Sequence, residues 1–234
     1  TYYLGGSLNI DLLTNTNLSV LKGGLPAVFL IIMALVLELK PFPANGWALD
    51  VYESANPGVS AIISSASASA VYFTLSKVMP LGGGEWHGLV VAAGVFSFLG
   101  ANLLGLKQKN PRRLLGYSSV AQMGLLLIVL GLKKHLGAST DLIAAGLLLG
   151  HFLGKATLFW LSGIIGKQNL KGWWIIRKKP LLLLAMGTAV FTLIGFPPFP
   201  SFFAKWELTL KLADANLLGW LALILLGSLL EAVY

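Results

Sequence analysis

Two residues that can carry protons, His151 and Lys155, lie four positions apart in the apolar stretch LLLGHFLGKATLFW. This spacing places both side chains on one face of a helix. Histidine changes its charge near neutral pH, and a lysine amine can also release and regain a proton. We expect the pair to belong to a proton-transfer route. The structural alternative is a hydrogen-bonded histidine beside a lysine whose ammonium group reaches the polar surface. Lys155 lies far from both ends of the expected segment, residues 141–166, so we expect it to be buried.

A second candidate site, residues 195–207, has the sequence GFPPFPSFFAKWE. Its three prolines interrupt any helix, because proline has no backbone N–H and clashes with the preceding turn. Lys205 and Glu207 follow the break. Charged residues at membrane depth indicate a function, so we expect both to take part in ion transfer. For Glu207 the alternative is a local pair with Lys211, four residues later.

Residues 25–47 repeat this combination of an apolar segment, prolines and charges. Glu38 and Lys40 are two residues apart and stand directly before Pro41 and Pro43. A carboxylate and an ammonium group in one interrupted helix could form a pair that opens and closes during ion transfer. The alternative is that the helix ends here and both groups lie at the membrane surface.

Arginines form the fourth candidate. Arg112 and Arg113 open the stretch RRLLGYSSVAQMG. Arg112 could supply positive charge to an ion path. Alternatively, both arginines are ordinary anchors of a helix start on the cytoplasmic side.

The composition places these residues in a membrane protein. Of the 234 residues 56% are hydrophobic and 11% are charged, whereas soluble domains carry about 25% charged residues. The net charge of +8 then indicates basic loops rather than a nucleic-acid partner. Absence of cysteine excludes disulfides and iron–sulfur ligation, and three scattered histidines argue against a metal site, so we expect no cofactor. The sequence starts at Thr1 and ends inside an apolar run, which suggests a fragment of a longer protein.

Hydrophobic segments predict an all-α polytopic protein with about seven transmembrane crossings, two of them discontinuous. The first 24 residues are expected to form an extramembrane loop with the end of an earlier helix. The expected segments are residues 25–47, 58–79, 88–106, 114–132, 141–166 and 180–212, and a last one that starts near residue 217.

Basic residues concentrate in two alternate loops. Residues 107–113 carry four Lys or Arg, and residues 167–179 carry five. Such loops face the cytoplasm, which we expect here. The two proline-broken segments would then run in opposite directions, as in inverted-repeat transporters.

Four stretches together resemble one family: PFPANGWALDVYESANPGVSA, PRRLLGYSSVAQMG, GHFLGKATLFWLSG and GFPPFPSFFAKWE. The family comprises the antiporter-like proton-translocating subunits of respiratory complex I, with relatives in membrane-bound hydrogenases and Mrp-type antiporters. The resemblance implies two inverted helical repeats, each with a discontinuous helix. Residues 25–80 would end the first repeat, and residues 81–234 would form most of the second.

The resemblance also implies roles for individual residues. Lys205 matches the lysine or glutamate of the second broken helix in the family. Lys155 matches the central lysine, and His151 matches the histidine one turn before it. Arg112 matches a basic residue that precedes the family's LAYSS-like stretch. With Glu38, Lys40 and Glu207, these residues would form a charged axis through the membrane.

This sequence departs from the family pattern at two places. The family usually has a lysine nine residues before the Trp of the first broken helix, where this chain has Glu38. The following helix usually carries a lysine or histidine in its first half. Here that stretch reads SAIISSASASA and has no titratable group.

We therefore expect a subunit that moves protons, or sodium ions, in a redox-driven complex I-like or hydrogenase-like translocase, without a redox site of its own. Its partners would be other membrane subunits, hydrophilic redox subunits and the lipid bilayer. Its location would be the cytoplasmic membrane of a bacterium or archaeon, or an organelle membrane. The alternative is a stand-alone cation/proton antiporter or solute transporter.

Overall fold

The computed structural model describes residues 2–15, 18, 21–82, 84 and 86–233. This part of the chain contains helices and no strands, which confirms the predicted all-α class. The helices are α1 (Tyr2–Gly5), α2 (Ile10–Asn15), α3 (Gly24–Glu38), α4 (Gly46–Ser54), α5 (Pro57–Ile62), η2 (Ile63–Ser67), α6 (Ala68–Val78), η3 (Met79–Gly82), α7 (His87–Gly105), α8 (Pro111–Gly131), α9 (Lys133–Leu136), α10 (Ser139–Ile165), η4 (Leu170–Lys178), α11 (Pro180–Ile194), α12 (Pro200–Asp214) and α13 (Leu218–Val233).

Among the described residues, four helices are long and apolar enough to cross a membrane: the continuous run Pro57–Gly82, α7, α8 and α10. Three shorter apolar helices, α3, α11 and α13, complete the seven expected segments. Helices α3 and α11 have 15 residues each, which corresponds to a length of about 22 Å. Because the hydrocarbon core is about 30 Å thick, each needs its continuation beyond the break.

The first break lies between α3 and α4. Lys40 has a left-handed backbone with φ of 62°, so the chain turns away from the direction of α3 here. Pro41 and Pro43 follow and cannot donate to a helix ladder. The Phe42 N–H instead donates to the Ser97 hydroxyl at 2.9 Å, which fixes the broken segment against α7.

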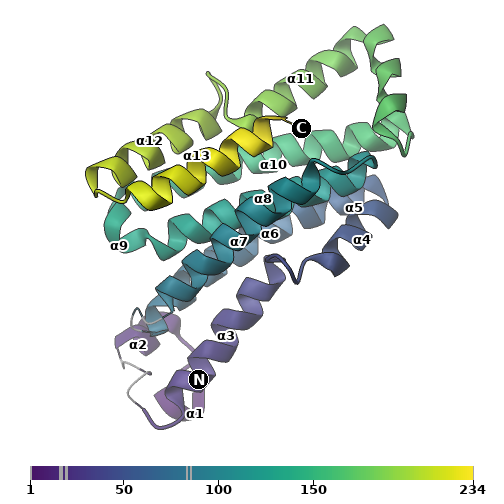
Figure 1. Ribbon diagram of the computed structural model, residues 1–234. Helices are drawn as coiled ribbons and strands as arrows, with labels where there is room; N and C mark the ends of the chain where they lie inside the picture. Colours follow the sequence, from purple (N-terminus) through teal and green to yellow (C-terminus); the bar gives the residue numbers. More distant parts are fainter. Residues whose placement is uncertain (1, 16–17, 19–20, 83, 85, 234) are drawn as a thin grey trace.

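The second break lies between α11 and α12 and starts at Gly195, whose φ of 84° is the left-handed conformation that commonly ends helices. Carbonyl groups at the end of α11 lack helical partners and must be satisfied otherwise. The Ser201 hydroxyl of α12 donates to one of them, Thr192 O. Figure 1 shows that α3–α4 and α11–α12 run in opposite directions, as the sequence predicts.

Helix α8 is the centre of the bundle and is almost wholly buried. Helix α10 packs against α8 and α5 on one side and against both halves of the second broken helix on the other. Gly150 and Gly154 make the second contact possible, because a side chain at these positions would meet Ser201 and Leu193. The space beside these two glycines is thus filled by another helix.

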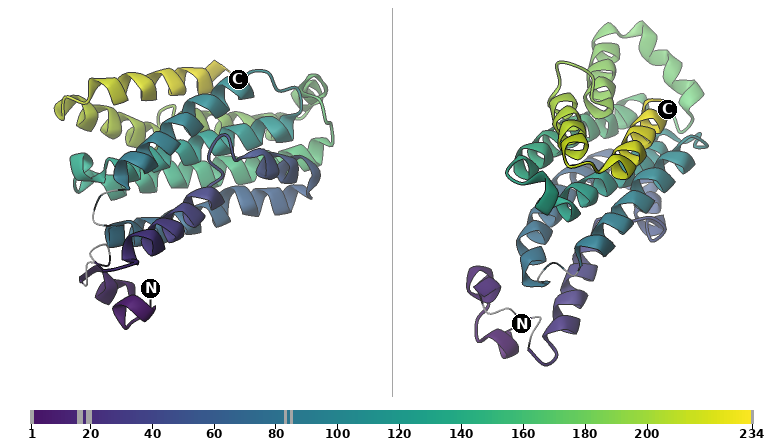
Figure 2. Two further views of the ribbon diagram at one scale, coloured as in Figure 1. Left: turned by 60° about the horizontal axis from the view of Figure 1, so that its bottom comes forward. Right: turned by 60° about the vertical axis from the view of Figure 1, so that its left-hand side comes forward.

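The two basic loops lie at the same end of the bundle, because the Leu170 N–H donates to Lys109 O at 3.0 Å. Neither is wholly a loop. Helix α8 already begins at Pro111, where the Asn110 side chain caps it, and the second contains the 3₁₀ helix η4. The predicted opening loop likewise contains α1 and α2, which Figure 2 shows at one end of the bundle.

Candidate ion-transfer site

Lys205 lies on the first turns of α12 and reaches back across the second break. Its Nζ donates to Ile194 O, the last carbonyl of α11, at 2.9 Å. The same Nζ pairs with Glu231 Oε2 of α13 at 2.8 Å. The side chains of Lys205 and Glu231 are only 12% and 3% exposed. Lys205 thus joins a carbonyl freed by the break to a buried carboxylate.

Glu231 is a member of this site that sequence reasoning did not include. Its second carboxylate oxygen accepts a hydrogen bond from the Gln122 amide of α8. The signal in the sequence is a single acidic residue in the otherwise apolar stretch LGWLALILLGSLLEAV. The sequence does not identify the partner of Glu231, because Lys205 is 26 residues earlier, on another helix.

Lys155 is fully buried in α10, as its depth in the sequence predicts. Its Nζ donates to Leu115 O of α8 at 3.0 Å. Glu231 is near enough to act on Lys155 electrostatically. The lysine therefore does not extend to the polar surface.

His151 is buried one turn earlier on α10. Its Nε2 lies 2.9 Å from Ser64 O, a carbonyl of the π-helical turn η2. His151 and Lys155 consequently contact two different neighbours, η2 and α8. The sequence predicts a shared face for the pair, and the structure adds that this face is turned into the core.

The two charges of the first break are separated. Lys40 is buried, and its Nζ has no hydrogen-bond partner among the described residues. It lies 5.8 Å from the centre of the Trp47 ring, within the range of a cation–π contact. Glu38 is exposed, and no ion pair joins it to Lys40 in the described part of the chain. In this conformation they do not form a closed pair.

Arg112 and Arg113 tie the start of α8 to the end of α4. Arg112 Nη1 donates to Ala55 O at 3.1 Å and lies 3.5 Å from Glu53 O. Arg113 Nη1 is 2.8 Å from both Asp50 Oδ1 and Glu53 Oε2. These contacts are those of helix anchors.

Glu207 is partly exposed on α12. Its Oε1 accepts from the Ser139 hydroxyl at 2.9 Å and lies 3.9 Å from Lys211 Nζ. The local pair with Lys211 is therefore present, and the structure does not bring Glu207 into contact with Lys205 or Glu231.

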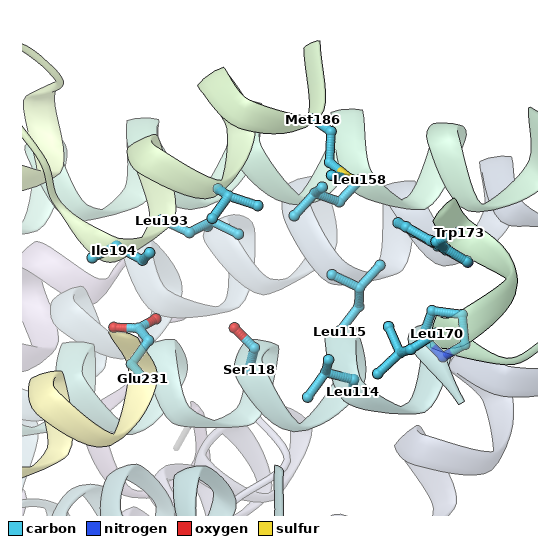
Figure 3. A pocket seen from close by; sticks show the side chains of 12 residues that line it. Leu114, Leu115, Ser118, Leu158, Leu170, Trp173, Met186, Leu193, Ile194 and Glu231 are labelled. Atoms are coloured by element: carbon cyan, nitrogen blue, oxygen red, sulfur yellow. The ribbon is translucent and has the colours of Figure 1, made fainter. Parts of the chain in front are cut away.

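A cavity of about 280 Å³ opens beside this network, between α8, α10, α11 and η4. Its walls are mostly apolar, and Figure 3 shows the Glu231 carboxylate and the Ser118 hydroxyl at one side of it. Leu115, whose carbonyl holds Lys155, and Ile194, whose carbonyl holds Lys205, both line it. The cavity is thus adjacent to both lysines. No group of three or more potential metal ligands occurs in the described residues.

A family model described as NADH:quinone oxidoreductase/Mrp antiporter, TM, matches residues 1–231. A relative named NADH-quinone oxidoreductase subunit N, from Desulforudis audaxviator, is 33% identical, and the alignment covers 100% of this chain and 48% of that protein. The chain spans about half the length of the curated relatives it matches.

Solved structures give the same result for the fold. A chain of respiratory complex I from Thermus thermophilus, with bound aureothin, has a TM-score of 0.80 and 26% identity over 99% of this chain and 51% of that one. A chain of the Mrp complex from a Dietzia species has a TM-score of 0.85 at 22% identity, over 99% of this chain and 44% of that one. The second likeness shows the fold alone.

Proposed function

The chain belongs to the NADH:quinone oxidoreductase/Mrp antiporter family of transmembrane proteins, and we propose that it is a proton-translocating membrane subunit of a redox-driven assembly. Sodium is the alternative ion. Electron transfer would take place in partner subunits, and this chain would supply the path for the ion.

The observation that carries the proposal is the buried Lys205–Glu231 pair at the second helix break. Two charges removed from water lose hydration that their attraction rarely restores in full, so such a pair is poor evidence of a stabilising device. Charged residues at membrane depth usually mark an ion pathway. The pair lies where the chain is interrupted and where a cavity adjoins it.

We propose a route from the first break through His151 and Lys155 to Lys205. When the Lys205 ammonium releases its proton toward the exit, it becomes a neutral amine and leaves Glu231 as an unpaired buried carboxylate. An unpaired charge in a low-dielectric site is costly. Glu231 would therefore attract the next proton from Lys155, after which the Lys205–Glu231 pair is restored.

The remaining residues would act nearer the surface. Glu38 and Glu207 stay predicted members of the relay, and their exposed or partly exposed positions suit proton exchange with water. Arg112 stays a predicted source of positive charge beside the path, because a guanidinium keeps its proton. Lys40, which is buried in the first break, would carry the charge there.

The relatives are named as subunits of larger quinone oxidoreductases or are parts of solved complexes. We propose that this integral membrane chain likewise assembles with other membrane subunits and with hydrophilic redox subunits. The basic end of the bundle, residues 107–113 and 167–179, would face the cytoplasm.

The test is proton translocation by the assembled complex in sealed vesicles. Lys155→Ala and Lys205→Ala should each abolish translocation, whereas Lys211→Ala, on the partly exposed side of α12, should not. Full translocation by both buried-lysine variants would refute the proposal. Ion transport by the isolated full-length chain, without redox partners, would favour a stand-alone antiporter.

A further inference from the structure

The helix that follows the first break contains one irregular turn that the sequence does not reveal. The run from Pro57 to Gly82 changes from α to π geometry over Ile63–Ser67. Turns of this kind are rare and frequently mark functional sites. This one falls in SAIISSASASA, the stretch without a titratable group.

The π turn contacts α10 through a carbonyl group. Ser64 O lies 2.9 Å from His151 Nε2. A carbonyl oxygen has two lone pairs and can accept this bond besides one from its own helix, but it cannot donate. The hydrogen of this bond must therefore sit on His151 Nε2. In a neutral imidazole only one nitrogen carries a hydrogen, so Nδ1 is left with a free lone pair.

The other nitrogen of the ring has no such fixed role. His151 Nδ1 is buried and has no hydrogen-bond partner among the described residues. Lys40 of the first break is near enough to act on His151 electrostatically, and so is Lys155. Nδ1 is thus a buried ring nitrogen with a free lone pair, on a residue that the lysines of both halves act on.

The π turn is itself fixed to the central helix. The Ser64 hydroxyl lies 3.2 Å from the Ser119 hydroxyl of α8, and both residues are buried. The neighbouring Ser65 differs, because its hydroxyl donates only to Ala61 O of its own helix, at 2.5 Å.

We propose that Ser64 and Ser119 are positioning residues, which hold the π turn so that the Ser64 carbonyl fixes the His151 tautomer and leaves Nδ1 as the proton-accepting atom. A proton given up by the Lys40 ammonium would bind Nδ1 and form imidazolium. Lys40 becomes a neutral amine, and Nδ1 then passes this proton to neutral Lys155, while Nε2 keeps its hydrogen on the Ser64 carbonyl. The role in transport rests on the proposed function, but the tautomer does not.

This arrangement of Ser64, Ser119 and His151 takes the place of a titratable side chain that this helix lacks. In the family pattern a lysine or histidine of this helix contributes a titratable group. Here the helix contributes a backbone carbonyl and a hydroxyl, which orient the histidine of α10. The helix takes part in the transfer without changing its own charge.

The direct test is nitrogen NMR of the full complex with ¹⁵N-labelled histidine, where a His151→Gln sample identifies the signals of His151. We expect a ring with hydrogen on Nε2 and none on Nδ1 in the neutral state. A neutral ring with its hydrogen on Nδ1 would overturn the proposal, whatever the transport measurements show.

The second test compares Ser64→Ala/Ser119→Ala with Ser65→Ala in the assembled complex. The double variant should mix the two tautomers and lower proton translocation about tenfold. Loss of a hydrogen-bond partner that orients a metal-binding histidine lowers activity by a similar factor. Ser65→Ala should change neither. Wild-type tautomer and translocation in the double variant would overturn the proposal. If Lys155→Ala also translocates normally, the proposed function fails separately, and the NMR result still decides the tautomer.

Discussion

Lys205 and Glu231 join α12, the second half of the broken helix, to α13 through one 2.8 Å ion pair. Lys205 lies in the second turn of α12, its Nζ also holds the last carbonyl of α11, and Glu231 belongs to α13. Three helical segments therefore meet at a single ammonium group. Any change in its charge alters contacts in all three, which is the property that an ion-transfer site at a break requires.

Removal of one charge of this pair should destabilise the protein. We expect Glu231→Gln to lower the free energy of unfolding by about 3–5 kcal/mol, because it leaves the Lys205 ammonium buried without a counter-charge. Lys211→Ala, which disrupts a partly exposed pair, should cost less than about 1 kcal/mol. Thermal unfolding of the purified complex measures both, and equal losses would contradict the interpretation.

Removal of both charges should separate stability from transport. Lys205→Met combined with Glu231→Leu is expected to regain most of the stability lost in Glu231→Gln, since apolar residues of similar size avoid the desolvation cost. Translocation should stay absent, because no group remains to take up the proton. Translocation near the wild-type rate in this double variant would mean that the ion does not pass through the pair.

Lys40 should be costly to stability and necessary for transport. Its buried Nζ has no hydrogen-bond partner among the described residues, so Lys40→Met is expected to raise the free energy of unfolding by about 1–3 kcal/mol. The same variant should lose proton translocation. Lys77→Met, at an exposed position of α6, is the matched control and should change neither. A Lys40→Met complex that translocates normally would remove the first break from the route.

The close contact between α10 and the second break can be tested at glycine. A Cβ at Gly150 would overlap the Ser201 side chain, whereas a Cβ at Gly187 of α11 would meet nothing within 4 Å. We expect Gly150→Ala to destabilise the protein by about 1–3 kcal/mol. Gly187→Ala should stabilise it by about 0.5–1 kcal/mol. Similar unfolding temperatures for the two variants would show that the helices do not approach so closely.

The sequence predicts the class of fold and the position of both breaks, because proline and glycine act on the local backbone. It also predicts that Lys155 is buried, because the residue lies far from either end of a long apolar segment. Local patterns of this kind need no knowledge of neighbouring helices.

The sequence does not predict which charges meet. Glu231 lacks a local partner, and its contact with Lys205 depends on how α12 packs against α13. Glu38 and Lys40 are only two residues apart, yet Glu38 is exposed and Lys40 is buried. The backbone of Lys40 is left-handed, which the sequence does not indicate. The π turn at Ser64 lies in a sequence that reads as a regular helix, and its partner Ser119 is 55 residues away.

The most direct test of the central claim is the number of protons moved per electron by the intact complex carrying Lys155→Met, reconstituted in sealed vesicles. The ion route proposed for Lys155, Lys205 and Glu231 predicts that electron transfer continues or slows. The number of protons moved per electron should fall by the number that this subunit moves. An assembled Lys155→Met complex with the wild-type number of protons per electron would contradict it.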